Sequence, residues 1–260
     1  MVKTQRVSFE ALLWGSLGIL SVFFAWYFLT TYTAARMLMP PPQEVAEFFW
    51  QHLFQPIGRH TIVEHTLWSI YRVVVGYVAG SVAGVIVGAA MGASPISKAI
   101  INPIFEIIRP IPVIAWIPLA ILWLGVGEVA KFFIIFIAAF PVLAVSTYAG
   151  TTRAVDPVLR GAARMLGCNR RQVFFKVSLP SALPTIFAGL QVSLSNCWMA
   201  VLAAEMVRSN MGAGWVILAG MDFANTTQIL AGMVAIALAG ASMVFILREI
   251  EQRLLAWNIR

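Results

Sequence analysis

The chain has 260 residues, of which 60% are hydrophobic and only 11% are charged, and its mean hydropathy is +0.84. A water-soluble domain carries about 25% charged residues, and it could not cover its surface with so few. The composition excludes an ordinary soluble enzyme and predicts an all-α protein embedded in membrane lipid. The net charge of +7 would suggest nucleic acid in a soluble protein. Here the basic residues gather in loops on one side, so we expect no nucleic-acid partner.

Six apolar stretches are each long enough to cross about 30 Å of hydrocarbon as a helix. They cover residues 11–32, 67–91, 100–124, 129–149, 182–207 and 229–247. The third stretch contains Pro103, Pro110, Pro112 and Pro118, and proline bends a helix by removing a backbone donor. Membranes tolerate broken helices where they line a cavity. We therefore predict that the third span lines a path through the protein.

The distribution of lysine and arginine predicts the orientation, because cytoplasmic loops of membrane proteins are enriched in both. An N-terminus in the cytoplasm gives four basic residues outside, namely Arg36, Arg59, Lys131 and Arg208. It gives twelve inside, namely Lys3, Arg6, Lys98, Arg153, Arg160, Arg164, Arg170, Arg171, Lys176, Arg248, Arg253 and Arg260. We expect a multi-pass protein with both termini in the cytoplasm and a first span that is retained, not cleaved as a signal peptide.

An outer loop follows the first span, and its apolar residues have the spacing of a short helix over residues 44–54, lying on the membrane surface. His52, His60 and His65 lie in or beside this loop. Their spacing fits no metal motif, so we expect solvated histidines and no metal site.

The second span carries a glycine at every fourth position from Gly76 to Gly92. Small residues at this spacing let another helix approach closely. The pattern predicts helix packing in preference to a ligand site.

The longest polar interruption, residues 150–181, has the signals of two short helices. Asp156 can cap the first, which begins at Pro157 and stops at Gly167. Asn169 can cap the second, which Pro180 is expected to end.

Three interpretations fit the basic residues of this segment: a loop that only sets topology, a helix pair on the membrane surface, or a docking element for a cytoplasmic partner. The docking element also explains the caps, the glycine corner, and the expected exposure of Phe174 and Phe175.

The order Gly-Ala-Ala at 161–163, glycine at 167 and Val-Ser-Leu-Pro at 177–180 resembles the EAA loop of the permease subunits of binding-protein-dependent ABC importers. The resemblance implies that this loop forms a coupling helix, which inserts into a cleft of an ATPase subunit. The residues it assigns to coupling are Gly161, Ala162, Ala163, Gly167, Arg170, Phe174, Leu179 and Pro180. Gly161 departs from the family pattern, which has glutamate there, and a glycine weakens the first helix locally.

Further segments resemble the taurine, sulfonate and nitrate permeases of the same family. They are RPIP at 109–112, AWIPL at 115–119, WLGVGE at 123–128, AAE at 203–205, MGAG at 211–214, and the closing Trp257. The resemblance implies a type I ABC importer permease fold with six transmembrane helices. It divides the chain into residues 1–60 (N-terminal segment, first helix and outer loop), 61–250 (permease domain with the coupling loop 150–181) and 251–260 (cytoplasmic tail).

Polar residues within the spans are candidates for the substrate path, because a charge at the bilayer centre needs a partner or a water-filled space. Glu106 and Arg109 lie three residues apart and could pair on one helix face, and Glu205 and Arg208 repeat that spacing. Each pair could brace a bent helix, and an arginine could also meet an anion. The full set of candidates is Glu106, Arg109, Trp116, Asn196, Trp198, Glu205 and Arg208. For Asn196, contact between helices is the alternative to contact with substrate.

The resemblance also implies the partners: a second copy of the chain, two cytoplasmic ATPase subunits that bind ATP and Mg, and a periplasmic or lipid-anchored binding protein. The chain itself has no P-loop motif, and we expect no catalytic residue, cofactor or metal in it. The implied location is the bacterial inner membrane. The implied cargo is a small anion, taurine or another sulfonate, with nitrate, bicarbonate, an aromatic carboxylate or a thiamin precursor as alternatives.

Two other classes of protein fit less well. An ion-coupled secondary transporter favours several mid-membrane carboxylates and an inverted repeat, and the sequence has few such carboxylates and no clear repeat. An intramembrane enzyme would need a catalytic constellation, and the spans contain neither a His-Glu-x-x-His motif nor a histidine.

Overall fold

The computed structural model describes residues 9–153 and 155–255, without the side chains of Phe9, Ala11, Leu12, Met37 and Arg208. The predictions for Lys3, Arg6, Trp257 and Arg260 lie outside this part. Across the described residues the chain is helical, and its extended structure is limited to an isolated bridge between Ile57 and His60.

Five helices are long and apolar enough to cross a membrane. They are α1 (Phe9–Tyr32), α3 (Ile62–Ala93), α6 (Glu128–Thr152), α9 (Leu179–Arg208) and α11 (Thr226–Leu254). A sixth crossing results if α4 (Pro95–Ile108) and α5 (Ile117–Leu124) together form one bent span. The predicted six spans and all-α class agree with this architecture.

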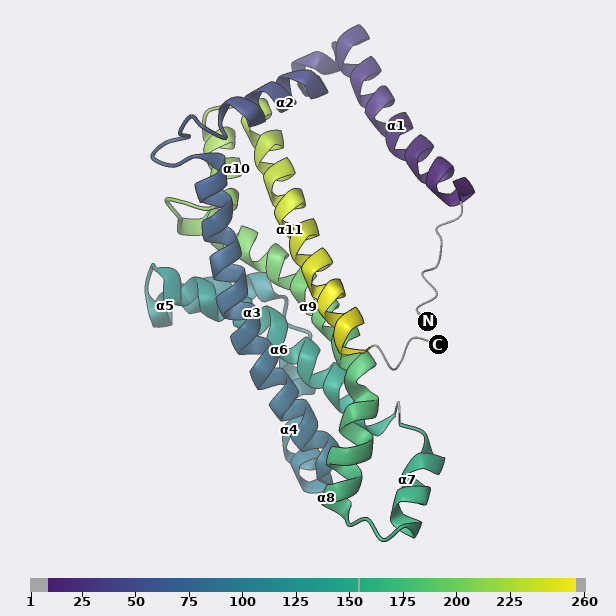
Figure 1. Cartoon of the computed structure of the whole chain (residues 1–260). Helices are drawn as coiled ribbons and strands as arrows, with labels where there is room; N and C mark the ends of the chain where they lie inside the picture. The colour runs from purple at the N-terminus through teal and green to yellow at the C-terminus, as the bar shows by residue number, and fades with distance from the viewer. Residues whose placement is uncertain (1–8, 154, 256–260) are drawn as a thin grey trace.

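The third predicted span is broken within residues 100–124, as its prolines predicted. The axes of α4 and the segment 113–124 differ by 90°, and Figure 1 shows α5 lying across the bundle while α4 runs along it. Pro110 and Pro112 occupy the break, which the short 3-10 helix η2 (Val113–Trp116) follows. Each proline removes a donor and disfavours helical geometry in the residue before it, whereas Pro103 is tolerated inside α4.

The glycines of α3 pack against α6, as their spacing predicted. A β-carbon added to Gly80 would lie 2.7 Å from the carbonyl oxygen of Phe136, and one added to Gly84 would lie 2.6 Å from Cβ of Leu143. At Gly88 a β-carbon would collide with the Ala144 backbone. The two backbones are therefore in close contact over several turns, and α9 packs against both α6 and α3.

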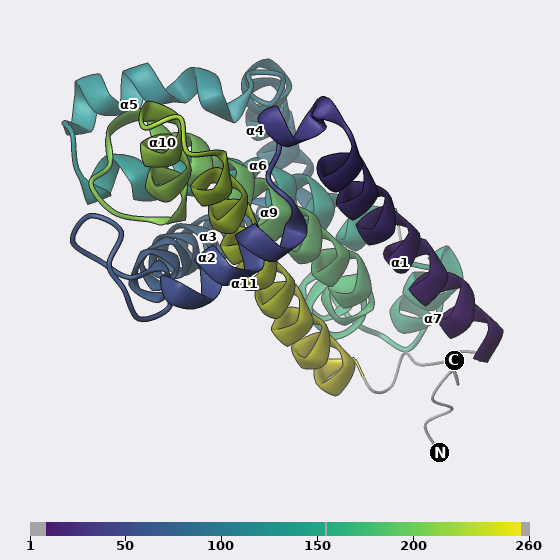
Figure 2. The ribbon, with the colours of Figure 1, turned by 90° about the horizontal axis from the view of Figure 1, so that it is seen from above.

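Helix α1 stands apart from the bundle and is joined to it through α2 (Pro42–Gln51) (Figures 1 and 2). Most of its surface is exposed apolar side chains. The outer helix predicted over residues 44–54 is confirmed as α2, which begins two residues earlier and ends three earlier. Val45 on α2 is buried together with residues of α10 (Ala213–Asp222) and α11.

The polar interruption forms α7 (Pro157–Met165) and α8 (Arg170–Val173), separated by a turn at Gly167. The predicted caps are confirmed: Asp156 accepts from the Val158 N–H, and Asn169 forms a reciprocal capping box with Gln172. Gly167 has φ +84°, a left-handed conformation that favours glycine.

Pro180 does not end the second helix, contrary to the prediction. The chain passes from α8 through a π-helical turn, η3 (Phe174–Ser178), directly into α9. Pro180 lies in the first turn of α9, where a missing N–H is tolerated, and the wider π turn accommodates the altered hydrogen-bond register.

Candidate functional site

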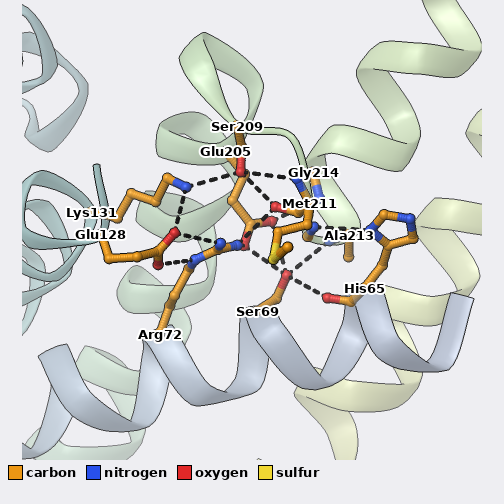
Figure 3. Close-up of polar contacts among 11 residues, drawn as sticks. His65, Ser69, Arg72, Glu128, Lys131, Glu205, Ser209, Met211, Ala213 and Gly214 are labelled. Atoms are coloured by element: carbon orange, nitrogen blue, oxygen red, sulfur yellow. Dashed lines mark hydrogen bonds and ion pairs between the residues drawn. The ribbon is translucent and has the colours of Figure 1, made fainter. Parts of the chain in front are cut away.

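A buried ionic cluster holds three helices together at the end of the bundle that carries α10 (Figure 3). Arg72 of α3 is completely buried. Its Nε and Nη2 donate to the two carboxylate oxygens of Glu128 at 2.6 and 2.7 Å. Its Nη1 donates to Glu205 at 2.7 Å and to the Met211 carbonyl at 2.9 Å. Four of the five N–H donors of this guanidinium are taken by protein groups, which identifies a structural ion pair.

Glu205 is also completely buried and has no free face for a ligand. Besides Arg72, it accepts hydrogen bonds from the Ser69 hydroxyl at 2.8 Å and the Gly214 N–H at 2.9 Å. A β-carbon on Gly212 would collide with the Glu205 carboxylate, and Gly212 has φ +123°. The glycines of the MGAG segment are therefore needed for the close approach of this loop to a buried charge.

Lys131 and His65 extend the cluster. Lys131 donates to Glu128 at 2.9 Å and to Ser209 at 3.0 Å. The backbone N–H of Gly212 donates to Nδ1 of His65 at 3.1 Å, and Nε2 of the same ring lies 3.1 Å from the Ile57 carbonyl oxygen. Because Nδ1 accepts, the ring must be neutral and donate through Nε2. His65 is buried in α3. The expectation that all three histidines are solvated was therefore wrong for His65.

The two predicted pairs of neighbouring charges, Glu106 with Arg109 and Glu205 with Arg208, have different outcomes. Glu106 accepts from the Asn102 amide at 2.6 Å, and no ion pair joins it to Arg109. The side chain of Arg208 lies outside the described part, so its pairing with Glu205 stays a prediction, and Glu205 pairs with Arg72. The sequence interpretation missed Arg72, although a lone arginine within the apolar run 67–91 signals a buried partner.

Three cavities have Arg109 in their lining at the break after α4, and two of them also contain a further charged or amide side chain. The first, which we name the bend cavity, has a volume of about 510 Å³ and lies between the break, α6 and α9. Its polar side chains are Arg109, Trp116 and Asn196, and the rest of its lining is mostly aliphatic or proline. The second, which we name the Tyr148 cavity, has about 450 Å³. It is more polar, because Asn102, Glu106, Arg109, Tyr148 and Arg153 line it.

The structure thus brings together four of the seven predicted path residues: Glu106, Arg109, Trp116 and Asn196. Trp198 does not line either cavity and is buried in the core between α9 and its neighbours. Glu205 belongs to the ionic cluster, and the surroundings of Arg208 are undescribed. Sequence spacing alone could not make this division, because it depends on where α4 breaks.

Helix α7 projects from the opposite end of the bundle from α10 (Figure 1). Its C-terminal residues expose large apolar side chains: Met165 is 90% exposed and Leu166 is 84% exposed. Phe175 is exposed, but Phe174 is half-buried and lies close to Gly92 of α3. The expected exposure of Phe174 was therefore wrong, and Met165 and Leu166 provide the exposed apolar surface.

The other residues assigned to the coupling loop occupy distinct positions. Gly161, Ala162 and Ala163 lie on α7, and the space around Gly161 is open. Arg170 begins α8 and is exposed, while Leu179 and Pro180 begin α9. Arg160, which the sequence interpretation did not single out, donates to the carbonyls of Thr151 and Thr152 at 3.0 and 2.6 Å. It fastens α7 to the last turn of α6.

No catalytic arrangement emerges from these features. Within residues 9–153 and 155–255, no group of three or more His, Cys, Asp or Glu side chains could hold a metal ion. The features that remain as candidates are an ionic cluster whose members pair with one another, two cavities that share Arg109, and a projecting helix with an apolar tip.

Comparison with known proteins identifies relatives of the chain. The chain is 35% identical to the taurine transport system permease protein TauC of Escherichia coli (strain K12) over 250 residues, which cover 94% of this chain and 89% of that protein. It is 34% identical to the putative aliphatic sulfonates transport permease protein SsuC of Bacillus subtilis (strain 168), covering 75% and 70%. It is 27% identical to the nitrate import permease protein NrtB of Leptolyngbya laminosa, covering 76% and 73%.

Solved structures share the fold. One chain of the inward-facing MetNI methionine ABC transporter superposes with a TM-score of 0.60 at 19% identity, covering 76% of this chain and 96% of that one. A chain of an amino acid ABC transporter crystallised with histidines gives a TM-score of 0.62 at 17% identity, covering 74% and 93%. Residues 80–255 match the family described as binding-protein-dependent transport system inner membrane component. From these matches and its helical membrane architecture, the chain belongs to the family of permease subunits of binding-protein-dependent ABC transporters.

Proposed function

We propose that this permease works as a pair of identical copies, with two separate ATPase subunits beneath it and a binding protein that delivers cargo from outside. Membership of the binding-protein-dependent family supports the partners. The chain lacks a P-loop motif, so the proposal assigns ATP and Mg to the ATPase subunits. The excess of lysine and arginine at the α7 end supports a cytoplasmic location for that end and for both termini.

The observation that carries the docking role is the exposed apolar tip of α7. Met165 and Leu166 are almost fully exposed beside the glycine turn, and exposed apolar side chains that cluster on a projecting element are typical of a protein interface. Arg160 binds the last carbonyls of α6. A displacement of α7 by the ATPase would therefore be transmitted to α6, which lines both cavities.

The proposed cargo is taurine or another small sulfonate. The support is the 35% identity to a taurine permease along nearly the whole chain, together with the similarity to a sulfonate permease. Nitrate is the second candidate, because a nitrate permease matches over three quarters of the chain at lower identity. An arginine at the junction of two cavities suits either anion.

The test is uptake of labelled taurine by proteoliposomes that contain the permease, its ATPase and its binding protein. Uptake should require all three proteins and ATP. The substitution Met165→Glu should lower uptake at least fivefold while the complex still inserts in the membrane, because a charge at the apolar tip opposes docking. Leu38→Glu, at an equally exposed position outside the coupling loop, is the matched control and should leave uptake unchanged.

Uptake by the permease alone would refute the importer mechanism. Wild-type uptake of nitrate with no uptake of taurine would replace the proposed cargo. Equal effects of Met165→Glu and Leu38→Glu would refute the docking role of α7.

A further inference from the structure

The two arginines within the apolar spans have opposite environments. Arg72 makes four hydrogen bonds to protein groups and is completely buried. The Arg109 guanidinium makes no hydrogen bond or ion pair with any group in the described part of the chain, although Glu106 lies one turn away. A guanidinium carries five donors and is always charged, and a charge at membrane depth needs a partner or water. Arg109 therefore has donors available for a ligand.

The position of Arg109 is set by the break in the span. It is the C-cap of α4 and is followed by Pro110, so the helix ends there and the next element turns by 90°. Arg109 and Pro110 line both the bend cavity and the Tyr148 cavity. The two cavities therefore adjoin at one cation, with the bend cavity toward α9 and the Tyr148 cavity toward the cytoplasmic end proposed above.

The linings of the two cavities differ in a way that suits the two ends of a small organic anion. In the bend cavity, an alkyl group can lie against Ile134, Ala138 and Met199, and α9 contributes the Asn196 amide to the lining. Trp116 also lines this cavity, and its indole Nε1 is buried with no hydrogen-bond partner among the described residues. The Tyr148 cavity adds a second cation, Arg153, and one carboxylate, Glu106.

We propose that Arg109 binds the charged head of a small alkyl oxyanion, a sulfonate or carboxylate, in two successive sites. The head stays on Arg109 while the tail first occupies the bend cavity, and the anion then passes into the Tyr148 cavity, where Arg153 supplies the next positive charge. Glu106 accepts a hydrogen bond from Asn102 at 2.6 Å and forms no ion pair with Arg109, so the guanidinium is free for the anion. This inference rests on the proposed import of an anion and names its binding residue.

The test uses charged thiol reagents, so it does not depend on knowing the cargo. Met199 lines the bend cavity and Ala149 lines the Tyr148 cavity. The thiols introduced by Met199→Cys or Ala149→Cys are placed in a Cys168→Ser background of the full complex in nanodiscs, and the native Cys197 is completely buried. The measured quantity is the rate of reaction with the anionic reagent 2-sulfonatoethyl methanethiosulfonate divided by the rate with its cationic trimethylammonium analogue. Each rate is first divided by the rate of the same reagent with a free thiol in solution.

The expected ratio is above one at both positions, and Arg109→Gln should lower it about tenfold at both, because removing a nearby unscreened charge changes the local anion concentration by such a factor. Arg109→Lys should keep most of the preference. Arg36→Gln, which removes an exposed arginine paired with Glu44, should leave both ratios unchanged. A thiol from Leu38→Cys, outside both cavities, should show no dependence on Arg109.

A ratio at or below one in the Met199→Cys or Ala149→Cys protein that retains Arg109 overturns the proposal. The proposal therefore stays testable even if the Arg109→Gln variant fails to assemble. A dependence on Arg109 at Met199→Cys but not at Ala149→Cys overturns the two successive sites. If the ratios behave as expected and the wild-type complex imports no taurine, the anion site stands and the proposed cargo falls.

Discussion

Arg72 of α3 and Glu205 of α9, which are 133 positions apart in the chain, meet at 2.7 Å with both side chains completely buried. The same arginine binds Glu128 at the start of α6. One guanidinium thus fixes the relative positions of three membrane helices and of the loop that leads into α10.

The first prediction concerns this pair. Arg72→Met leaves Glu205 buried without its counter-charge, and breaking a buried pair in this way costs about 3–5 kcal/mol. The expected result is a large fall in the thermal midpoint of the permease in detergent, measured by fluorescence-detected size exclusion. Arg36→Met, which removes the exposed pair with Glu44, should cost no more than about 1 kcal/mol.

A double variant separates the charge imbalance from the loss of packing. Arg72→Met combined with Glu205→Met should be less destabilised than the sum of the two single variants, because it leaves no orphan charge on α9. Additive effects would contradict the buried pair as the source of the stabilisation.

The second prediction concerns the contact between α3 and α6. Gly84→Ala places a methyl group 2.6 Å from Cβ of Leu143 and 2.7 Å from the Phe140 carbonyl, and the backbone oxygen cannot move aside locally. We expect a destabilisation of about 1–3 kcal/mol, seen as a lower thermal midpoint. Gly18→Ala is the control, and it should raise the thermal midpoint slightly. No atom lies within 4 Å of a β-carbon at this position on α1, and alanine stabilises a helix over glycine by up to about 1 kcal/mol. Similar midpoints for both variants would refute direct backbone packing.

The third prediction concerns Arg160. Because its guanidinium donates to the carbonyls of Thr151 and Thr152, Arg160→Ala should loosen the link between α7 and α6 while the exposed apolar tip of α7 remains. The ATPase should still bind and hydrolyse ATP at a rate within about twofold of wild type, but uptake per ATP should fall several-fold. Arg164→Ala is the matched control, because this arginine lies on the same helix and its side chain makes no hydrogen bond or ion pair in the described part of the chain. Unchanged uptake per ATP in Arg160→Ala would exclude this connection.

The fourth prediction concerns the residue at which the loop departs from its family. Gly161 lies in the middle of α7, and a β-carbon added to it would have no atom within 4 Å. Gly161→Glu should therefore be accommodated without displacement and should stabilise α7 by about 0.5–1 kcal/mol. Slower amide hydrogen exchange in α7, with uptake at least equal to wild type, is the expected result. A loss of ATPase binding would show that the absence of a side chain at 161 is itself required.

Much of this architecture could be predicted from the sequence, because lipid imposes simple rules. The length of the apolar stretches predicted the membrane spans. The capping residues Asp156 and Asn169 predicted where two helices begin, and the glycine repeat predicted the face of α3 that packs against another helix. Each of these signals is local, and a local rule suffices where the backbone must satisfy its own hydrogen bonds.

The errors arose where tertiary context decides the outcome. Pro180 looked like a helix stop, but a π turn absorbs it and α9 continues. Arg72, the buried partner of Glu205, was missed because it comes from a helix that no spacing rule connects to Glu205. The cavities at Arg109 depend on the 90° bend between α4 and the segment that follows. The four prolines of this span predicted a bend, but the sequence does not specify its angle.

The contact between the glycines of α3 and the backbone of α6 has a mechanical consequence. Two helices whose main chains touch along several turns cannot slide past each other without lifting apart, and the ionic cluster pins α9 to the same pair. Helices α3, α6 and α9 should therefore turn as one rigid body under a force applied to α7, the proposed docking helix. If the permease works as the proposed pair, the motion needed for transport has to come from the α4–α5 elbow and from the junction between the two copies, and those are the places where hinge motion should be sought.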